Sequence, residues 1–309
     1  MTTILLAESR FAPAARMELE AIGEVVPFDR FEAELPRAEA IVVGLELELD
    51  RTVLDRAPRL RVIATRTSQL RHIDVAETRR RGIEVLRIDP DDPVLRETSS
   101  TAELTLALLL GLVRKLPWAF DALKAARWAP ARGDYGGNEL RGKTLGVVGY
   151  GRLGRMVAAY AKALAMEVVA HDPYVDVDDV EPVSLEELLK RSHAISVHCS
   201  FTEETRGLIG ADELAVARPG AVLVNTARGE IVDEAALLEA LRSGRLAGAA
   251  VDTIAGERSD GSHLRDHPLV RHAREHENLI VLPHLGGATA EATERTQIRI
   301  SRKLADHLR

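Results

Sequence analysis

Cysteine is almost absent from the sequence, since Cys199 is the single thiol in 309 residues. One cysteine cannot form an intrachain disulfide and supplies no metal cluster, which favours a reducing, cytoplasmic location and a site without a metal. Long apolar runs are also missing, because no stretch reaches the roughly 20 apolar residues of a membrane helix. The opening residues, MTTILLAESR, lack the basic start and apolar run of a signal peptide. We therefore expect no membrane partner.

The chain also has no excess of basic residues. Lys and Arg number 41 and Asp and Glu number 48, which gives a formal net charge of -7. This balance provides no general positive field for a polyanion, so we expect no nucleic-acid partner. A small anionic substrate would have to be held by a few placed cations.

What the sequence does contain is enough apolar surface for a core. Apolar residues make up 46% and charged residues 29% of the composition, which is ordinary for a globular protein. The length of 309 residues favours two domains.

Short runs rich in Val, Ile and Leu alternate with segments of helical periodicity, which predicts the α/β class with parallel sheets and crossover helices. The first third predicts one small sheet from residues 4–6, 41–43, 62–64 and 83–86. From Thr144 six further strands are expected to form a second, doubly wound sheet: 145–148, 168–170, 194–197, 221–224, 249–251 and 279–282.

Several residues predict where helices begin and end. Ser100 and Glu103 have the spacing of a capping box, and Pro117 is expected to kink or divide the helix that follows. Ser184 and Asp233 are expected to begin helices, and Gly244 to end one. The polar residues 258–277 predict an extended surface loop, and the polar stretch 89–98 predicts a linker that could act as a hinge.

The strongest local motif is LGVVGYGRLG at residues 145–154, a strand that runs into Gly149, Gly151 and Gly154 and then into a helix. In a dinucleotide-binding turn the first glycine permits the turn, the second lets the backbone approach a pyrophosphate, and the third lets the helix pack on the strand. Asp172 follows the next strand and could accept hydrogen bonds from a ribose diol, which favours NAD over NADP. Arg152 or His171 could alter that preference. The alternative is an ordinary strand-to-helix turn with Asp172 as a helix cap.

Three ionisable residues follow successive late strands, at the edge where an open α/β sheet binds its ligand. Arg228 could hold a carboxylate through two parallel hydrogen bonds, although an isolated arginine more often forms a surface ion pair. His284 could exchange a proton with a hydroxyl near neutral pH, although a lone histidine is usually structural. Glu257 could pair with the imidazole and stabilise its charged form, or be an exposed loop acid.

Four ordered motifs together resemble the D-isomer-specific 2-hydroxyacid dehydrogenases, the group that includes phosphoglycerate dehydrogenase. The resemblance spans nearly the whole chain. Its motifs are the glycines at 149, 151 and 154, the NTARG segment 225–229, Asp252 followed five residues later by Glu257, and the PHLGG segment 283–287.

The resemblance implies an NAD-dependent enzyme that moves a hydride between nicotinamide and C2 of a small D-2-hydroxy or 2-oxo acid. Arg228 would orient the substrate, His284 would be the acid and base, and Glu257 would support His284. The Rossmann cofactor domain, 99–284, would be inserted into a flavodoxin-like substrate domain, 1–98 plus 285–309, and the chain would form a homodimer. The implied cofactor contacts are Gly149, Tyr150, Gly151, Arg152, Leu153, Gly154, Asp172, His198, Thr226, Ala227, Asp252, His284 and Gly286.

The substrate loop departs from the family pattern and leaves the substrate open. Where relatives usually have glycine before a D-or-H-x-ID segment, this chain has TSQLRHID at 67–74. Ser68 and Gln69 are expected to contact substrate beside Arg228 and His284. Arg66, Arg71 and His72 could hold a phosphate or a second carboxylate, or be solvated surface cations. Two other functions stay open: an NAD-gated binding protein related to transcriptional corepressors, and a dehydrogenase for another small anion such as phosphite.

Overall fold

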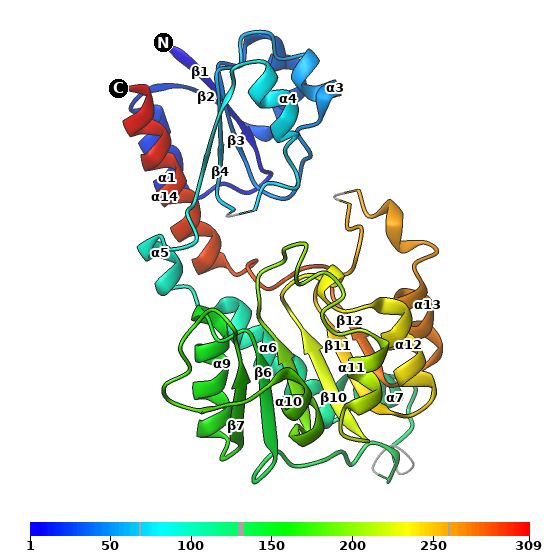
Figure 1. The fold of residues 1–309 in the computed structure, drawn as a ribbon. Coiled ribbons are helices and arrows are strands. Elements are labelled where there is room, and N and C mark those ends of the chain that lie inside the picture. The colour runs from blue at the N-terminus through cyan, green and yellow to red at the C-terminus, as the bar shows by residue number, and fades with distance from the viewer. Residues whose placement is uncertain (68, 129–132, 259) are drawn as a thin grey trace. The chain divides into compact units, whose positions relative to one another are not determined.

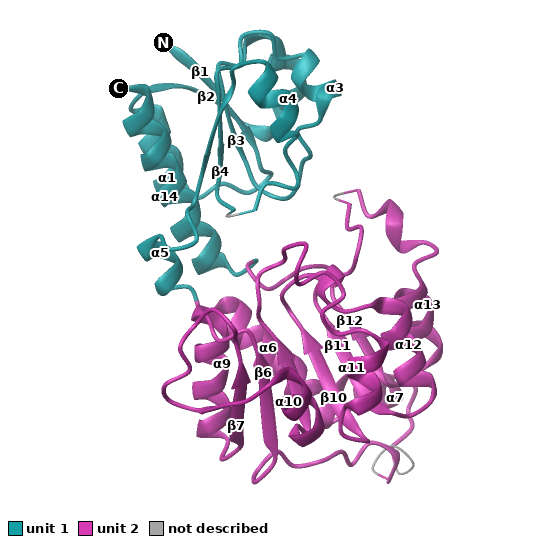
Figure 2. Cartoon of the chain, in the orientation of Figure 1, with its two compact units in different colours: residues 1–98, 288–309 teal, residues 99–287 magenta. Residues whose placement is uncertain are grey.

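The computed structural model describes residues 1–67, 69–128, 133–258 and 260–309. The chain divides into two compact units (Figure 2). Unit 1 consists of Met1–Thr98 and Ala288–Arg309, and unit 2 consists of Ser99–Gly287. Unit 2 is therefore built from one continuous segment, whereas unit 1 is completed by the last helix of the chain.

Unit 1 is a five-stranded parallel sheet in the order β2-β1-β3-β4-β5, with helices on both faces. The last helix, α14, lies beside α1 on one face (Figure 1), which joins the two ends of the chain in one core. The strands are β1 (Thr2–Ala7), β2 (Gly23–Val26), β3 (Ala40–Val43), β4 (Val62–Thr65) and β5 (Glu84–Arg87). The helices are α1 (Pro13–Glu20), α2 (Phe31–Glu34), α3 (Arg51–Asp55), α4 (Val75–Arg80), α5 (Pro93–Arg96) and α14 (Ala290–Leu308), with 3-10 turns η1 (Phe28–Arg30) and η2 (Leu35–Arg37).

Unit 2 contains a seven-stranded parallel sheet in the order β12-β11-β10-β9-β6-β7-β8. The chain leaves β6 toward β7 and β8 on one side and then returns to add β9 on the other side. The strand order thus reverses between β6 and β9, and ligands bind at such a switch point, beyond the carboxyl ends of the strands. The strands are β6 (Thr144–Val148), β7 (Glu167–His171), β8 (Glu181–Pro182), β9 (Ala194–Val197), β10 (Ala221–Asn225), β11 (Leu246–Val251) and β12 (Leu279–Val281).

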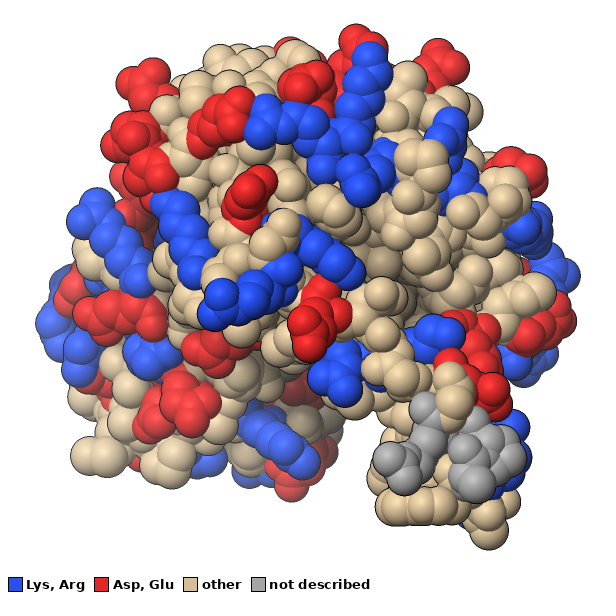
Figure 3. All heavy atoms as spheres, turned by 90° about the horizontal axis from the view of Figure 1, so that it is seen from below, with Lys and Arg blue, Asp and Glu red and all other residues tan. Residues whose placement is uncertain are grey.

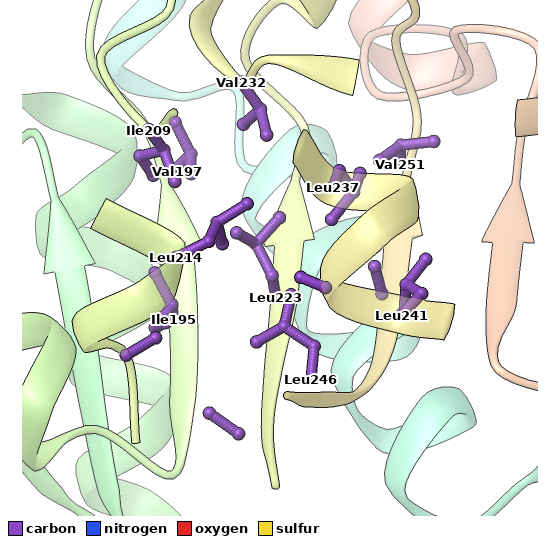
Figure 4. Packing of buried hydrophobic residues seen from close by; sticks show 14 of the residues in the cluster. Ile195, Val197, Ile209, Leu214, Leu223, Val232, Leu237, Leu241, Leu246 and Val251 are labelled. Atoms are coloured by element: carbon purple, nitrogen blue, oxygen red, sulfur yellow. The ribbon is translucent and has the colours of Figure 1, made fainter. Parts of the chain in front are cut away.

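Two separate apolar layers cover the two faces of this sheet. Figure 4 shows one layer, in which Leu214 of α11 and Leu237 of α12 pack on Leu223 and its neighbours. The other layer packs α6 and α9 on the opposite face. The helices of unit 2 are α6 (Ser100–Val113), α7 (Leu116–Lys124), α9 (Arg152–Ala163), α10 (Leu185–Arg191), α11 (Ala211–Val216), α12 (Glu234–Arg242) and α13 (Pro268–Glu275), with 3-10 turns η3 (Gly229–Ile231) and η4 (Ser262–Leu264).

The predicted α/β class with two parallel sheets is confirmed. Each predicted strand overlaps one observed strand, although Ile83 and Leu282 lie just outside β5 and β12, and β2 and β8 are additional. Both additional strands are short, with four and two residues, and their sequences GEVV and EP have no continuous apolar run. They lie at sheet edges, where less of a strand is buried, so hydrophobic pattern is a weak guide to them.

Local signals placed several helix ends correctly. The Ser184 hydroxyl accepts a hydrogen bond from Glu187 N, and Asp233 caps α12 through Ala236 N. Pro117 divides the long helix as expected, because α6 ends at Val113 and α7 begins at Leu116. The capping position of α6 is Ser99 rather than Ser100, and its hydroxyl donates to Glu103.

The prediction of an extended loop at 258–277 is wrong for part of that segment, which contains η4 and the helix α13. His267 caps α13 and Pro268 occupies its first turn, while Leu269 and His272 are buried. The overall polarity of the segment concealed one apolar face, since only a few residues of an amphipathic helix need to be buried.

The segment 89–98, expected as a polar linker, includes α5 and belongs to unit 1. Asp92 accepts a hydrogen bond from Arg299, and Asp89 accepts one from Lys303. Both donors lie on α14, so the last helix of the chain fixes this segment to unit 1.

Charged side chains of both signs are mixed over the described part of the surface in Figure 3. Within the described ranges, none of the helices combines the length and the apolar character that crossing a bilayer requires.

Leu223 provides a test of the core in Figure 4, because its side chain is fully buried in β10. We expect Leu223→Ala to lower the free energy of unfolding by about 2–5 kcal/mol, from lost burial and the cavity that is left. Val216→Ala is the control, since Val216 is 37% exposed and should cost far less. Urea unfolding of the three proteins measures this difference, and equal losses for the two variants would contradict the assigned core.

Candidate active site

The loops after β6, β9, β10, β11 and β12 carry most of the residues predicted to bind cofactor or substrate. Parallel strands end at one edge of the sheet, so these loops lie at the same edge of unit 2. Gly149 follows β6, His198 follows β9, Thr226 follows β10, Asp252 follows β11, and His284 lies just beyond β12.

The glycine turn after β6 has no room for side chains at two of its positions. Gly149 has a φ of 91°, and a Cβ there would lie 2.3 Å from the backbone nitrogen of Cys199. A Cβ at Gly154 would lie 2.1 Å from the carbonyl oxygen of Gly149. At Gly151, by contrast, a Cβ would meet no atom within 4 Å, so this backbone is open to a ligand.

The helix after the turn, α9, begins with Gly151 at its capping position and has no side-chain cap. Its first turn contains Arg152 and Leu153, and burial lowers the pKa of Arg152. An uncapped helix N-terminus carries unsatisfied N–H groups and a partial positive charge, which suit a phosphate. The open backbone and the uncapped helix therefore fit the pyrophosphate of a dinucleotide.

Asp172, at the end of β7, accepts hydrogen bonds from three backbone N–H groups: Tyr150 at 2.7 Å, Tyr174 at 2.9 Å and Val175 at 3.1 Å. It therefore connects the glycine turn to the loop after β7, and it does not cap a helix in the structure. The carboxylate is placed beside the turn, as a contact to the adenosine ribose requires.

The Tyr150 side chain has a structural position, although the residue was expected at the cofactor. The ring is fully buried, its hydroxyl donates to Asp179 at 2.6 Å, and the Arg155 guanidinium lies over the ring. Burial, followed by the hydrogen bond to Asp179, raises the pKa of Tyr150. Any cofactor contact from this residue would come from its backbone.

His198 is a neutral, partly buried histidine at the switch point. Its Nε2 lies 2.7 Å from the Ser196 hydroxyl, and burial lowers the pKa of His198 to about 4. Its Nδ1 is buried without a hydrogen-bond partner, which leaves one polar atom for a ligand.

The residues after β10, the strand beside β9, are held by side-chain contacts. The Thr226 hydroxyl lies 2.8 Å from the Thr105 hydroxyl on α6. Ala227 N donates to Asn225.

Glu257 and His284 form the pair that the sequence suggested. Glu257 Oε2 lies 2.7 Å from His284 Nδ1, and Ile254 N donates to Glu257 Oε1 at 2.9 Å. The two side chains are 29% and 28% exposed. Burial alone would raise the pKa of Glu257, but the hydrogen bond with His284, its charge and that of Arg228 bring the pKa below its ordinary value. The ionised carboxylate thereby directs Nε2 of the imidazole away from itself.

Asp252 holds the backbone around His284 in an unusual conformation. His284 has a φ of 55°, which a residue other than glycine seldom adopts. Asp252 O accepts from His284 N, and the Asp252 carboxylate accepts from Leu285 N at 2.7 Å and Gly286 N at 2.8 Å. Asp252 is fully buried, and this burial raises its pKa. The strain at His284 is thus balanced by three hydrogen bonds that Asp252 accepts.

Arg228 follows β10 in a loop that its neighbours fix. Asn225 Nδ2 donates to the carbonyl oxygen of Arg228 at 2.8 Å, and Arg228 Nη1 donates to Ala227 O at 2.5 Å. A Cβ at Gly229 would lie 2.2 Å from the carbonyl carbon of Ile254. The loop with Arg228 is therefore packed directly on the loop that leads to Glu257.

The substrate-loop residues belong to unit 1. Ser68 lies outside the described residues, and Gln69 is partly buried, with its carbonyl oxygen bonded by Thr67. Arg66 is not a solvated cation, because its side chain is 17% exposed and its Nε donates to Glu8 at 2.8 Å. His72 is buried against Thr65, and burial with the charge of Arg66 lowers the pKa of His72 to about 4. His72 is therefore neutral, and Arg71 also has an interaction partner.

Sequence reasoning missed the hydroxyls that contact predicted residues. Ser196 lies two positions before His198, and this strand spacing could have placed both side chains on one face. Thr105 reaches Thr226 from α6, 121 residues earlier, and no local pattern indicates that contact.

Comparison with known proteins agrees with this geometry. Residues 106–286 match the family model described as "D-isomer specific 2-hydroxyacid dehydrogenase, NAD binding domain". The chain belongs to the D-isomer-specific 2-hydroxyacid dehydrogenase family. The resemblance inferred from the motifs is thereby confirmed, and unit 2 contains the family's NAD-binding domain.

Relatives cover nearly all of the chain. D-3-phosphoglycerate dehydrogenase of Mycobacterium tuberculosis is 37% identical over 317 aligned residues, 98% of this chain and 56% of that protein. The Bacillus subtilis protein of the same name is 34% identical over 88% of this chain and 50% of its own length. The chain spans about half the length of these curated relatives.

Solved structures have the same fold over both units. D-lactate dehydrogenase of Aquifex aeolicus, complexed with NAD and lactic acid, has a TM-score of 0.75 and 28% identity, and covers 98% of this chain and 94% of its own. A Thermus thermophilus protein, TT0316, has a TM-score of 0.80 and 33% identity over 97% of this chain and 94% of its own.

Gly151 offers a direct test of the cofactor position within this family fold. We expect Gly151→Ala to weaken NADH binding at least about tenfold, because the new methyl group would occupy the space left for the pyrophosphate. The melting temperature without NADH should stay unchanged, since a Cβ at Gly151 meets no protein atom within 4 Å. Gly133→Ala, also into open space, is the control. Unchanged NADH affinity in Gly151→Ala, measured by calorimetry, would place the cofactor elsewhere.

Proposed function

We propose that the chain is an NAD-dependent dehydrogenase that interconverts a small D-2-hydroxy acid and its 2-oxo acid. The hydrogen-bonded Glu257–His284 pair, at the sheet edge that carries the glycine turn, is the observation that supports this proposal most strongly. Family relatives are named for phosphoglycerate, lactate and glyoxylate. We propose a substrate of the phosphoglycerate, glycerate or hydroxypyruvate, or glyoxylate type.

In the reducing direction, His284 donates a proton from Nε2 to the C2 oxygen of the oxo acid. Nε2 is the atom available for this step because Nδ1 faces Glu257 at 2.7 Å. The bound cofactor would supply the hydride as NADH in this direction and would accept it as NAD in the reverse direction. In the oxidising direction, the neutral imidazole accepts the proton from the C2 hydroxyl.

Arg228 would hold the substrate carboxylate and orient C2. A guanidinium forms two parallel hydrogen bonds to a carboxylate, and the remaining charge polarises a neighbouring carbonyl. The contacts from Asn225 and Gly229 restrict the loop, so less conformational freedom is lost when substrate binds. Glu257 stabilises the imidazolium, and Asp252 keeps the His284 backbone in its strained conformation. Gln69 and Ser68 stay predictions as further substrate contacts.

The proposal also covers the domain boundaries, the cellular location and the oligomeric state of the chain. We propose that residues 99–284 bind NAD, that 1–98 with 285–309 form the substrate domain, and that the chain acts in the cytoplasm as a homodimer. The exposed apolar side chains of α7, namely Leu116, Phe120 and Leu123, support a subunit contact.

The proposed reaction is tested by NADH oxidation with the purified chain and a panel of oxo acids: glyoxylate, pyruvate, hydroxypyruvate, phosphohydroxypyruvate and bulkier 2-oxo acids. NAD reduction with phosphite is assayed in parallel. We expect saturable turnover with at least one 2-oxo acid. Tight NADH binding without turnover on any acid would instead favour an NAD-gated binding protein. Activity with phosphite alone would show that the substrate is phosphite and not a 2-oxo acid.

Substitutions at His284 and at Arg228 should change different kinetic constants. We expect His284→Gln to lower kcat by about 10²–10⁴-fold, because it removes the proton donor, with little change in NADH affinity. Arg228→Lys should mainly raise KM for the oxo acid, because a single ammonium cannot form two parallel bonds. Steady-state kinetics with both variants separate these effects. Normal turnover in His284→Gln would remove the imidazole from the mechanism.

The pH dependence should report the Glu257 charge. Reduction requires a protonated imidazole, so kcat/KM should fall as pH rises. In Glu257→Gln the imidazolium loses a negative charge at 2.7 Å, and we expect the fall to occur at lower pH than in the wild type. The pKa of Glu257 is below its ordinary value, so the wild-type carboxylate is ionised throughout the neutral range. A fall at the same pH in both proteins would show that the pair does not control the reaction.

A further inference from the structure

We propose that Glu234, held by His267, is a positioning residue for the Glu257–His284 pair. Glu234 is the first residue of α12, directly after the loop with Arg228, and His267 is the capping residue of α13. The role rests on the proposed function, in which that pair transfers the proton. Glu234 acts on the loop that leads to Glu257, through a hydrogen bond from Ala255 N.

The first step is a hydrogen bond to that loop. Ala255 N donates to Glu234 Oε1 at 2.7 Å, one residue after Ile254 N donates to Glu257 Oε1 at 2.9 Å. Two carboxylates thus fix successive peptide groups in the segment between β11 and Glu257. The bond to Glu234 is short, at 2.7 Å, so Glu234 restrains this peptide.

The second step is the packing of the same peptide on the Arg228 loop. A Cβ at Gly229 would lie 2.3 Å from Ala255 N, which leaves no space between the two backbones. Ala255 is therefore held by Glu234 through its N–H and by Gly229 through backbone contact. A shift of this peptide would change the position of Glu257 and the support of Arg228 together.

His267 fixes the orientation of Glu234. Its Nδ1 accepts a hydrogen bond from Leu269 N at 3.3 Å, so the proton of the neutral ring is on Nε2. That Nε2 lies 3.3 Å from Glu234 Oε2, and the two side chains are 9% and 19% exposed. One carboxylate oxygen of Glu234 thus faces the imidazole and the other faces Ala255.

The charges around Glu234 show why it needs this support. Burial raises the pKa of Glu234, and the negative charges of Glu230 and Asp233 act in the same direction, while the hydrogen bond from Ala255 N lowers it. The N-terminal end of α12 also favours an anion at this position. The neighbouring acids Glu230 and Asp233 disfavour a charged carboxylate at this position. Contact with His267 therefore helps to keep the Glu234 carboxylate in place as the acceptor for Ala255 N.

The test is Glu234→Gln, which keeps the size of the side chain but cannot satisfy both contacts. If the amide oxygen accepts from Ala255, the amide NH2 faces the Nε2–H of His267, and the reverse orientation places two donors at Ala255. His267→Ala weakens the same link from its other side and carries the test if Glu234→Gln does not fold. Glu239→Gln is the control, because Glu239 lies on the same helix with an exposed side chain.

Two readouts separate positioning from general stability. The ring ¹⁵N chemical shifts of His284, assigned against His284→Gln, report which nitrogen carries the proton of the neutral ring. We expect the Nδ1–H form in the wild type and in Glu239→Gln, and a shift toward the Nε2–H form in Glu234→Gln, as in Glu257→Gln. We also expect kcat to fall about tenfold or more in Glu234→Gln, with KM for NADH unchanged.

A Glu234→Gln protein with a lower melting temperature but with the wild-type ring tautomer and kcat would overturn the proposal, because Glu234 would then be only structural. The tautomer measurement needs no substrate. It therefore decides the role of Glu234 even if the wild type reduces none of the oxo acids, an outcome that would contradict the proposed function separately.

Discussion

The buried carboxylate of Asp252 is the constraint on which the rest of the site depends. It comes directly after β11 and accepts hydrogen bonds from two N–H groups of the loop after β12, Leu285 and Gly286. These bonds hold His284 at a φ of 55°, where the imidazole meets Glu257. A fully buried carboxylate needs such partners, and a strained backbone needs such support, so each compensates the cost of the other.

The parallel sheet of unit 2 explains how residues far apart in the sequence reach the same edge. Gly149 and His284 are separated by 134 intervening residues, yet each follows a strand of one sheet. Because every strand in that sheet points the same way, each strand-to-helix loop is delivered to the same edge. Asp252, Glu257 and Glu234 accept hydrogen bonds from backbone N–H groups of these loops, which fix the relative positions of the loops. The strands place the loops, and the hydrogen bonds to these three carboxylates fix the loop positions more exactly.

Much of this arrangement could be predicted because its signals are local. The glycines at 149 and 154 are required by backbone contacts, and Pro117 and Ser184 act within one helical turn. The order of the motifs along the chain was sufficient to indicate the family and the Glu257–His284 pair.

Other features depend on partners that are distant in sequence. Arg66 could have been a surface cation, and only the fold brings Glu8 to it across 58 positions. The helix α13 was hidden in a polar segment because its buried face consists of few residues. Glu234 contacts Ala255 across 21 positions, and its neighbours in the sequence indicate only a helix start. Sequence patterns identify which residues can act, whereas burial and long-range contacts decide which of them do.

We have proposed that this chain transfers a hydride to C2 of a 2-oxo acid beside His284. The most direct measurement uses NADH deuterated at the transferable position of nicotinamide C4 and follows the label into the product by mass spectrometry and chiral chromatography. We expect a D-2-hydroxy acid that carries one deuterium at C2. A product without the label, or one with the opposite configuration at C2, would contradict it.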